Sequence, residues 1–151
     1  MTHANRDSIE HFVRSTLGCG CPDEVFQHVV ISRLPAVAGR PAIVQLLVGS
    51  RLLIHVVALP DGLAANGRIE QLASNGCTTR DRHGYNRFRL VIVSPAPPAS
   101  TGEIQQRFAR AIVGDPKAHL HFVGSEQLPA GLELPAQCSQ VPTGPLRADA
   151  K

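Results

Sequence analysis

The fold is decided by residues 43–59, which read IVQLLVGSRLLIHVVAL and contain two apolar runs joined by a glycine and a serine. The runs, at 43–48 and 52–59, are rich in β-branched and other apolar side chains, which is typical of strands. Gly49-Ser50 between them suits a tight hairpin turn with glycine in the first position. The stretch therefore predicts a long apolar β-hairpin.

Strand and helix patterns alternate after this hairpin. Apolar residues at helical spacing and the pair Asn75-Gly76 predict a helix and its end. The expected elements are a helix at 63–74, a polar loop at 77–86, a strand at 87–94, a helix at 101–113 and a strand at 119–123. Strands separated by single helices usually lie parallel. We therefore expect an α/β fold, with α+β as the alternative: a mixed sheet of four or five strands with an antiparallel hairpin and packed helices.

The composition of the 151 residues bounds the domain organisation and the class of protein. The length suits one domain, which we assign to residues 1–125, followed by a Pro-rich tail at 126–151 that we expect to be loosely packed or disordered. A net charge of +3 is too small to indicate a nucleic-acid binder. We find no apolar run long enough for a membrane span and no secretory signal, so we expect a cytoplasmic protein with reduced thiols.

Two of the four cysteines lie close together in residues 17–26, which read LGCGCPDEVF. Gly18 is suited to end the preceding helix, because glycine adopts the left-handed conformation without strain. Cys21 then falls at the N-cap of a second helix, with Pro22 as its first residue. The positive end of that helix lowers the pKa of the Cys21 thiol, whereas the two carboxylates that follow oppose this.

Three interpretations of this turn stay open. Cys19 and Cys21 bind a transition metal such as zinc or iron, with Cys77 as third ligand and His83 as fourth. Alternatively they are a redox pair, with Cys21 as the activated thiolate and Cys19 as the resolving thiol. The third interpretation is structural: both are small side chains buried beneath a loop. The sequence does not decide whether the protein is an enzyme.

An arginine-rich segment at residues 80–89 provides a second hypothesis, a non-enzymatic binding or adaptor module with structural cysteines. Guanidinium groups bind phosphate or carboxylate in a bidentate manner, so the arginines predict a ligand clamp that contacts a protein partner. The candidate residues are Arg80, Arg82, Arg87 and Arg89. The alternative is a solvated loop with salt bridges. Nucleic acid is the least favoured partner, and the long apolar hairpin allows a homodimer that covers a sheet edge.

His119 and His121 alternate on the last expected strand, so their imidazoles project from one face. Such a pair can bind zinc, and His55 on another apolar strand would be a further ligand. The alternative is that these histidines are hydrogen-bonded residues on the open face of a sheet.

Residues 17–26 resemble a motif, L-G-C-x-C-P-x-E-V-F, of small uncharacterised bacterial proteins. Residues 85–90, which read YNRFRL, are similar to a segment of the same group. The resemblance covers a small part of the chain and implies no activity or catalytic residues. It favours only the expectation that the two segments matter together.

Overall fold

The order of elements follows from the alternating strand and helix patterns of the sequence. The computed structural model describes residues 6–18, 20, 23–35, 42–58, 68–93, 101–129 and 132. The elements are α1 (Arg6–His11), the π-helix η1 (Phe12–Thr16), the 3₁₀-helix η2 (Asp23–Gln27), β1 (Val29–Leu34), β2 (Ile43–Val48), β3 (Leu52–Ala58), α2 (Arg68–His83), β4 (Arg87–Val93), α3 (Thr101–Ile112), β5 (Ala118–Val123) and the 3₁₀-helix η4 (Ser125–Gln127).

One mixed sheet holds the five described strands in their sequence order, β1-β2-β3-β4-β5. The first three strands are antiparallel, with Leu52 paired to Val48 across the hairpin. Each of the next two pairs is parallel, and a helix connects its strands: α2 leads from β3 to β4, and α3 leads from β4 to β5. The predicted α/β fold, with a mixed sheet and an antiparallel hairpin, is confirmed. No helix in the described ranges is both long enough and apolar enough to cross a membrane.

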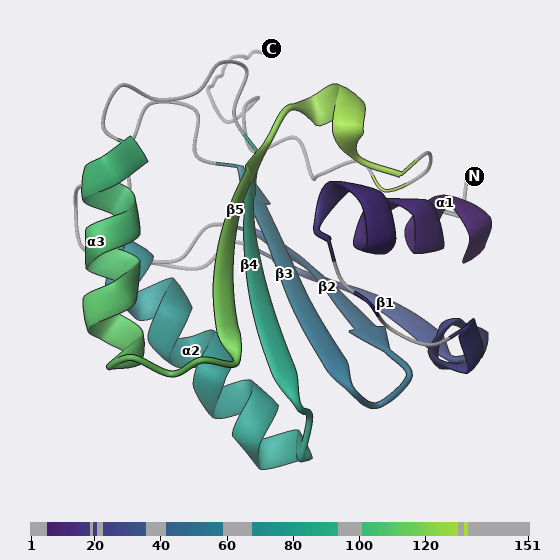
Figure 1. Cartoon of the computed structure of the whole chain (residues 1–151), viewed down its shortest axis with the longest axis horizontal. Coiled ribbons are helices and arrows are strands. Elements are labelled where there is room, and N and C mark those ends of the chain that lie inside the picture. Colours follow the sequence, from purple (N-terminus) through teal and green to yellow (C-terminus); the bar gives the residue numbers. More distant parts are fainter. Residues whose placement is uncertain are drawn as a thin grey trace, which may run out of the picture.

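Helices cover both faces of this sheet (Figure 1). α2 and α3 pack on one face, where Leu53, Phe88 and Leu90 belong to a buried cluster that we call the α2/α3-side cluster. α1, η1 and η2 pack on the opposite face, where Leu46 and Ile54 belong to the α1-side cluster. Successive strand residues point to opposite faces, so the near-continuous apolar run of β3 supplies both clusters.

The predicted tight hairpin turn with Gly49 in its first position is confirmed. Gly49 and Ser50 both have positive φ, 61° and 59°, and the Arg51 N–H donates to the Val48 carbonyl at 3.1 Å. This pattern is that of a type I′ turn, whereas glycine alone in the first position would indicate type II′. A Cβ at Gly49 would lie 2.4 Å from the Cβ of Val25, so glycine is also required by the packing of η2.

The predicted polar loop at residues 77–86 is wrong, because α2 continues to His83. The buried face of α2 follows helical spacing to its last turn, but the final positions are Gly76, Cys77 and Arg80 rather than aliphatic residues. Gly76 does not end the helix, since it lies where the helix crosses the Phe88 ring. A Cβ there would be 2.0 Å from Phe88 Cζ. The start predicted at residue 63 lies outside the described residues.

Gly84 follows the last residue of α2 and ends the helix, a role that the sequence predicted for Gly76. Its φ is +73°, its N–H donates to the Asp81 carbonyl at 3.2 Å, and the Tyr85 N–H donates to the Arg80 carbonyl at 2.9 Å. These two bonds form a Schellman motif, the usual glycine-terminated helix end. The turn then leads directly into β4.

The N-terminal helices place Leu17 and Gly18, which precede the two cysteines, next to the sheet. η1 ends at Leu17, whose N–H donates to the Phe12 carbonyl at 3.0 Å, and Gly18 follows with a φ of +73°. The predicted role of Gly18 as the left-handed residue after the helix is confirmed. The next helix is the single 3₁₀ segment η2, and Cys21 and Pro22, predicted to begin it, lie outside the described residues.

Part of the segment after residue 126 is packed on the core. Leu132 is fully buried in the α1-side cluster, and Leu128 packs against the same cluster. Residues 133–151 lie outside the described part of the chain. The division of the chain at 125/126 therefore stays a prediction.

We expect Gly76→Ala to destabilise the protein by roughly 1–3 kcal/mol, because the added methyl must displace the Phe88 ring or the helix. A chemical denaturation curve measures this. The matched control is Gly102→Ala in α3, which has open space around its Cβ and should be neutral or stabilising. In a double-mutant cycle, Phe88→Leu should recover part of the Gly76→Ala loss. Equal effects of the two alanine variants would contradict this packing role.

Candidate functional site

The cysteine motif itself lies largely outside the described residues. Neither Cys19 nor Cys21 is among them, so their metal and redox roles stay predictions. Leu17, two residues before Cys19, is buried in the α1-side cluster. Its carbonyl accepts a hydrogen bond of 3.0 Å from Nη1 of Arg89 on β4. The residues that lead into the motif are therefore fixed to the middle of the sheet.

The two further ligands predicted for a metal, Cys77 and His83, both lie on α2. Cys77 is half-buried against the α2/α3-side cluster, and burial raises the pKa of its thiol although Arg80 lowers it. Leu17 lies on the opposite face of the sheet. His83 packs edge-on against Tyr85, with ring centroids 6.0 Å apart. Within the described residues, no group of three or more His, Cys, Asp or Glu side chains is placed to hold a metal ion.

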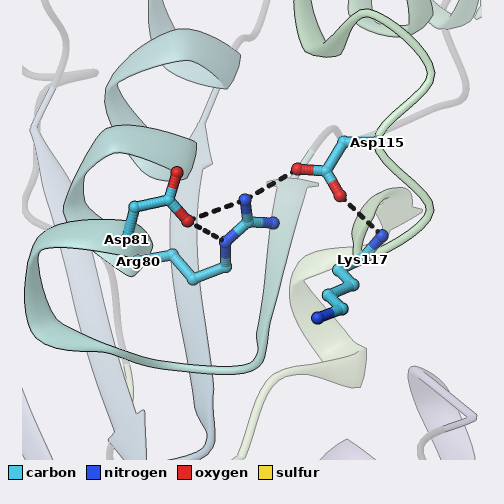
Figure 2. A network of polar contacts seen from close by, with 4 residues as sticks. All are labelled: Arg80, Asp81, Asp115 and Lys117. Carbon is cyan, nitrogen blue, oxygen red and sulfur yellow. Dashed lines mark hydrogen bonds and ion pairs between the residues drawn. The ribbon is translucent and has the colours of Figure 1, made fainter.

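Arg80 is buried and forms an ion-pair network that joins α2 to the loop between α3 and β5 (Figure 2). Its Nη2 donates to Asp115 Oδ2 at 2.7 Å, and its Nε donates to Asp81 Oδ1 at 3.0 Å. The other oxygen of Asp115 accepts the Lys117 N–H at 2.8 Å. The hydrogen bond from Arg80 is the largest cause of the lowered pKa of Asp115. Arg80 thus contacts two carboxylates and holds the last turn of α2 against the loop between α3 and β5.

The structure divides the four predicted clamp arginines between different surroundings. Arg80 belongs to the network just described, and Arg82 is exposed in the last turn of α2. Arg87 and Arg89 lie on β4 and alternate with residues of the α2/α3-side cluster, so both project from the other face of the sheet. Only these last two share a location.

Two histidines of β5 join Arg87 and Arg89 on that face. In the parallel register Arg89 is opposite His119, and Val91 is opposite His121. Alternation then places both imidazoles and both guanidinium groups on the same side of two adjacent strands. We call Arg87, Arg89, His119 and His121 the Arg89 cluster.

Arg89 is the central and most buried member, with 8% of its surface exposed. Its Nη1 donates to the Leu17 carbonyl and, at 2.7 Å, to His121 Nε2. Its Nε is buried and has no hydrogen-bond partner among the described residues. No carboxylate within those residues is paired with Arg89, in contrast to Arg80. Desolvation and the nearby charge of Arg87 lower the pKa of Arg89.

The two histidines differ in their hydrogen bonding. His121 Nε2 accepts from Arg89, which has only donors, so the His121 ring is neutral with its proton on Nδ1. Burial, together with Arg89 and His119, lowers the pKa of His121 to about 4. His119 Nε2 is buried and has no partner in the described part of the chain. Burial and the two arginines also lower the pKa of His119, whereas Asp115 raises it.

His55, considered with the histidine pair, lies on the opposite face. Its ring is 3% exposed, packs edge-on against Phe88, and bonds to Gln45 Oε1 at 3.0 Å. The sequence singled out the β4 arginines and the β5 histidines separately and did not join them. The signal that predicts the cluster is the spacing of two residues within each pair, the arginines on one strand and the histidines on the next. Because one helix separates these strands, they are expected to be parallel neighbours, which brings the two pairs together.

Comparisons with protein-family models, curated proteins and solved structures found no match. The resemblance of residues 17–26 and 85–90 to small bacterial proteins stays a prediction.

We expect acid to destabilise the protein through His121. Its folded-state pKa is about 4 and its ordinary value 6.5, so unfolding takes up a proton between these pH values. The stabilisation is complete above pH 6.5 and is lost as pH falls to about 4. In a fully buried group each unit of pKa difference would change the free energy of unfolding by ~1.4 kcal/mol. Because the His121 ring is partly exposed, we expect a smaller total loss, on the order of 1–2 kcal/mol.

Denaturation curves at several pH values measure this dependence. His121→Gln keeps an acceptor for Arg89 and should show a shallower decline over the same window. His11→Gln, a change at an exposed histidine on α1, is the matched control and should leave the decline unchanged. A wild-type slope in His121→Gln would refute the assignment.

Proposed function

We propose that this protein is an anion-binding module whose site is the Arg89 cluster. The observation that carries the proposal is Arg89, a residue that is more than nine-tenths buried and whose Nε has no partner among the described residues. This is a narrower form of the binding-module hypothesis, with Arg87 and Arg89 retained and Arg80 and Arg82 left out.

Energetics support an anion as the missing partner. A buried donor without a hydrogen bond costs about 1–3 kcal/mol, and a buried charge costs more unless an opposite charge is near. Arg80 shows the usual solution in this fold, since two carboxylates contact it. For Arg89 the contacts within the described residues are a carbonyl and a neutral imidazole. An anion bound at Nε would supply both the acceptor and the charge.

The surroundings of Arg89 also favour an anion over a metal cation. Arg87 lies two residues away on the same face, and its charge acts unfavourably on Arg89. Two guanidinium groups disfavour a cation between the histidines, although alternate histidines on a strand otherwise suit zinc. The same positive charge attracts phosphate or carboxylate, which guanidinium binds with directed hydrogen bonds.

Inorganic phosphate should bind to the wild-type protein and raise its melting temperature. At a phosphate concentration about a hundred times Kd the stabilisation is about 2.7 kcal/mol. Arg89→Met should abolish binding, because it removes the central donor while keeping an apolar side chain of similar length. Arg87→Gln changes an exposed residue and should weaken binding without loss of stability. Titration calorimetry and thermal melts measure both effects.

Arg82→Gln is the matched control for lost charge, because Arg82 is an exposed arginine of α2 away from the cluster. It should bind phosphate as the wild type does. If Arg89→Met fails to fold, Arg87→Gln still tests the site. Neither heat nor a melting shift with phosphate, sulfate and acetate for the wild-type protein would overturn the proposal.

A metal or thiol-redox site at Cys19 and Cys21 is the second proposal, and two cysteines separated by one glycine support it. Cysteines that bind a metal or act as nucleophiles must be reduced and deprotonated. A reducing compartment such as the cytoplasm keeps them reduced. The raised pKa of Cys77 and its packing on the α2/α3 side favour ligands other than Cys77 for such a site.

Protein purified without oxygen or chelator should contain stoichiometric zinc or iron, and Cys21→Ser should lose it with its melting temperature retained. If no metal is present, the rate of thiol alkylation tests the redox form, and Cys21→Ser should remove the fastest-reacting thiol. Cys77→Ser is the control and should keep both properties. Neither metal nor a fast-reacting thiol would leave these cysteines with the structural role.

A further inference from the structure

The Arg89 cluster offers donors from more than one direction. Arg89 Nε on β4 and His119 Nε2 on the adjacent strand are buried and have no hydrogen-bond partner within the described residues, and the exposed Arg87 lies two residues from Arg89 on the same face. A carboxylate has two oxygens in one plane, and a single guanidinium satisfies it. Donors from three side chains on two strands suit a tetrahedral group with three terminal oxygens, which a phosphate monoester presents.

The two histidines also differ in their capacity to gain a proton. His121 Nε2 is occupied by the hydrogen bond from Arg89, so protonation there would break that bond. His119 Nε2 has no such bond within the described residues, so it can be protonated and then donate.

We infer that the Arg89 cluster binds the dianionic phosphate group of a monoester, and that His119 takes up a proton as this group binds. The inference rests on the proposed anion site and names its ligand class and its linkage to pH. The shared chemistry is the terminal phosphate, whether free or carried on a small organic molecule.

The proton balance is simple. In the free protein His119 is mainly neutral at pH 7, because burial, Arg87 and Arg89 oppose its charge and only Asp115 favours it. A bound dianion reverses the sign of the local field, so a proton from solvent binds Nε2 and forms a charge-assisted hydrogen bond to a phosphate oxygen. His121 stays neutral, since Arg89 still donates to it. No bond of the phosphate is broken.

Titration calorimetry at pH 7 in buffers of different ionisation enthalpy tests this linkage. The probes are inorganic phosphate, glycerol 3-phosphate, dimethyl phosphate and acetate, added to the whole chain. Glycerol 3-phosphate, which is mainly a dianion at pH 7, should bind with uptake of up to one proton, and its affinity should fall as pH rises above 7. Inorganic phosphate should show a smaller net uptake, because its monoanionic fraction releases a proton when it binds as the dianion. Dimethyl phosphate, a permanent monoanion, and acetate should bind at least about tenfold more weakly, a difference of about 1.4 kcal/mol.

His119→Gln should still bind phosphate, more weakly, and with no proton uptake. His11→Gln, a change at an exposed histidine on α1 outside the cluster, is the matched control and should retain both the affinity and the uptake. The difference between inorganic phosphate and glycerol 3-phosphate reports whether the organic part adds affinity. Glycerol 3-phosphate binding without buffer dependence, or acetate and dimethyl phosphate bound as tightly as the monoester, would overturn the inference and leave the anion site intact. Absence of binding by all four probes would overturn the proposed function itself.

Discussion

Burial of the central strands on both faces is the constraint on which the structure depends. β3 is buried along all but its last residue and β4 along all but its first, so helices must cover both sides of the sheet. The parallel connections supply α2 and α3 to one face. The N-terminal helices are then required on the other, and η1 carries Leu17 to the position where its carbonyl contacts Arg89.

The same constraint makes the Arg89 cluster unusual in this molecule. On the α1 side of β4, Arg89 interrupts a face whose other buried positions are Val91 and Val93. The fold accepts Arg80 on the opposite side through two carboxylates, and it orders the end of α2 by doing so. Within the described residues, Arg89 donates only to uncharged acceptors, a carbonyl and an imidazole. Arg87 places a second positive charge near it. Of these two buried arginines, Arg80 joins α2 to the loop before β5, whereas Arg89 lies beside a second positive charge.

The sequence predicts the strands well because their signal is strong. The apolar runs of the hairpin, the run beginning at Arg87 and the parallel order all agree with the structure, since period and length distinguish strands from helices there. The second half of α2 was missed for a specific reason. Asn75-Gly76 is a common stop signal, and the buried stripe continues through Gly76, Cys77 and Arg80, which no hydrophobicity pattern recognises. Only the contact with the Phe88 ring explains that glycine.

The candidate site was predictable in its parts but not in its assembly. Alternation identified Arg87 with Arg89, and His119 with His121, as pairs that share a face. Their union depends on the parallel pairing of β4 with β5, and the burial of Arg89 depends on η1, which is remote in sequence. Arg80 lies apart from Arg89 because residues 77–83 are helical. Since the sequence predicted a loop there, the predicted clamp grouped the two arginines together.

The strands lie in the sheet in the same order as in the chain, and this affects the order in which they are expected to fold. Leu52 pairs with Val48 inside the hairpin but with Arg87 across the parallel boundary, so the antiparallel half is local and the parallel half requires closure of long loops. Hairpins form in about 1–10 μs, whereas non-local pairing is slower. The three antiparallel strands are thus expected to provide an early template, and β4, with its arginines, joins only after α2 has crossed the sheet.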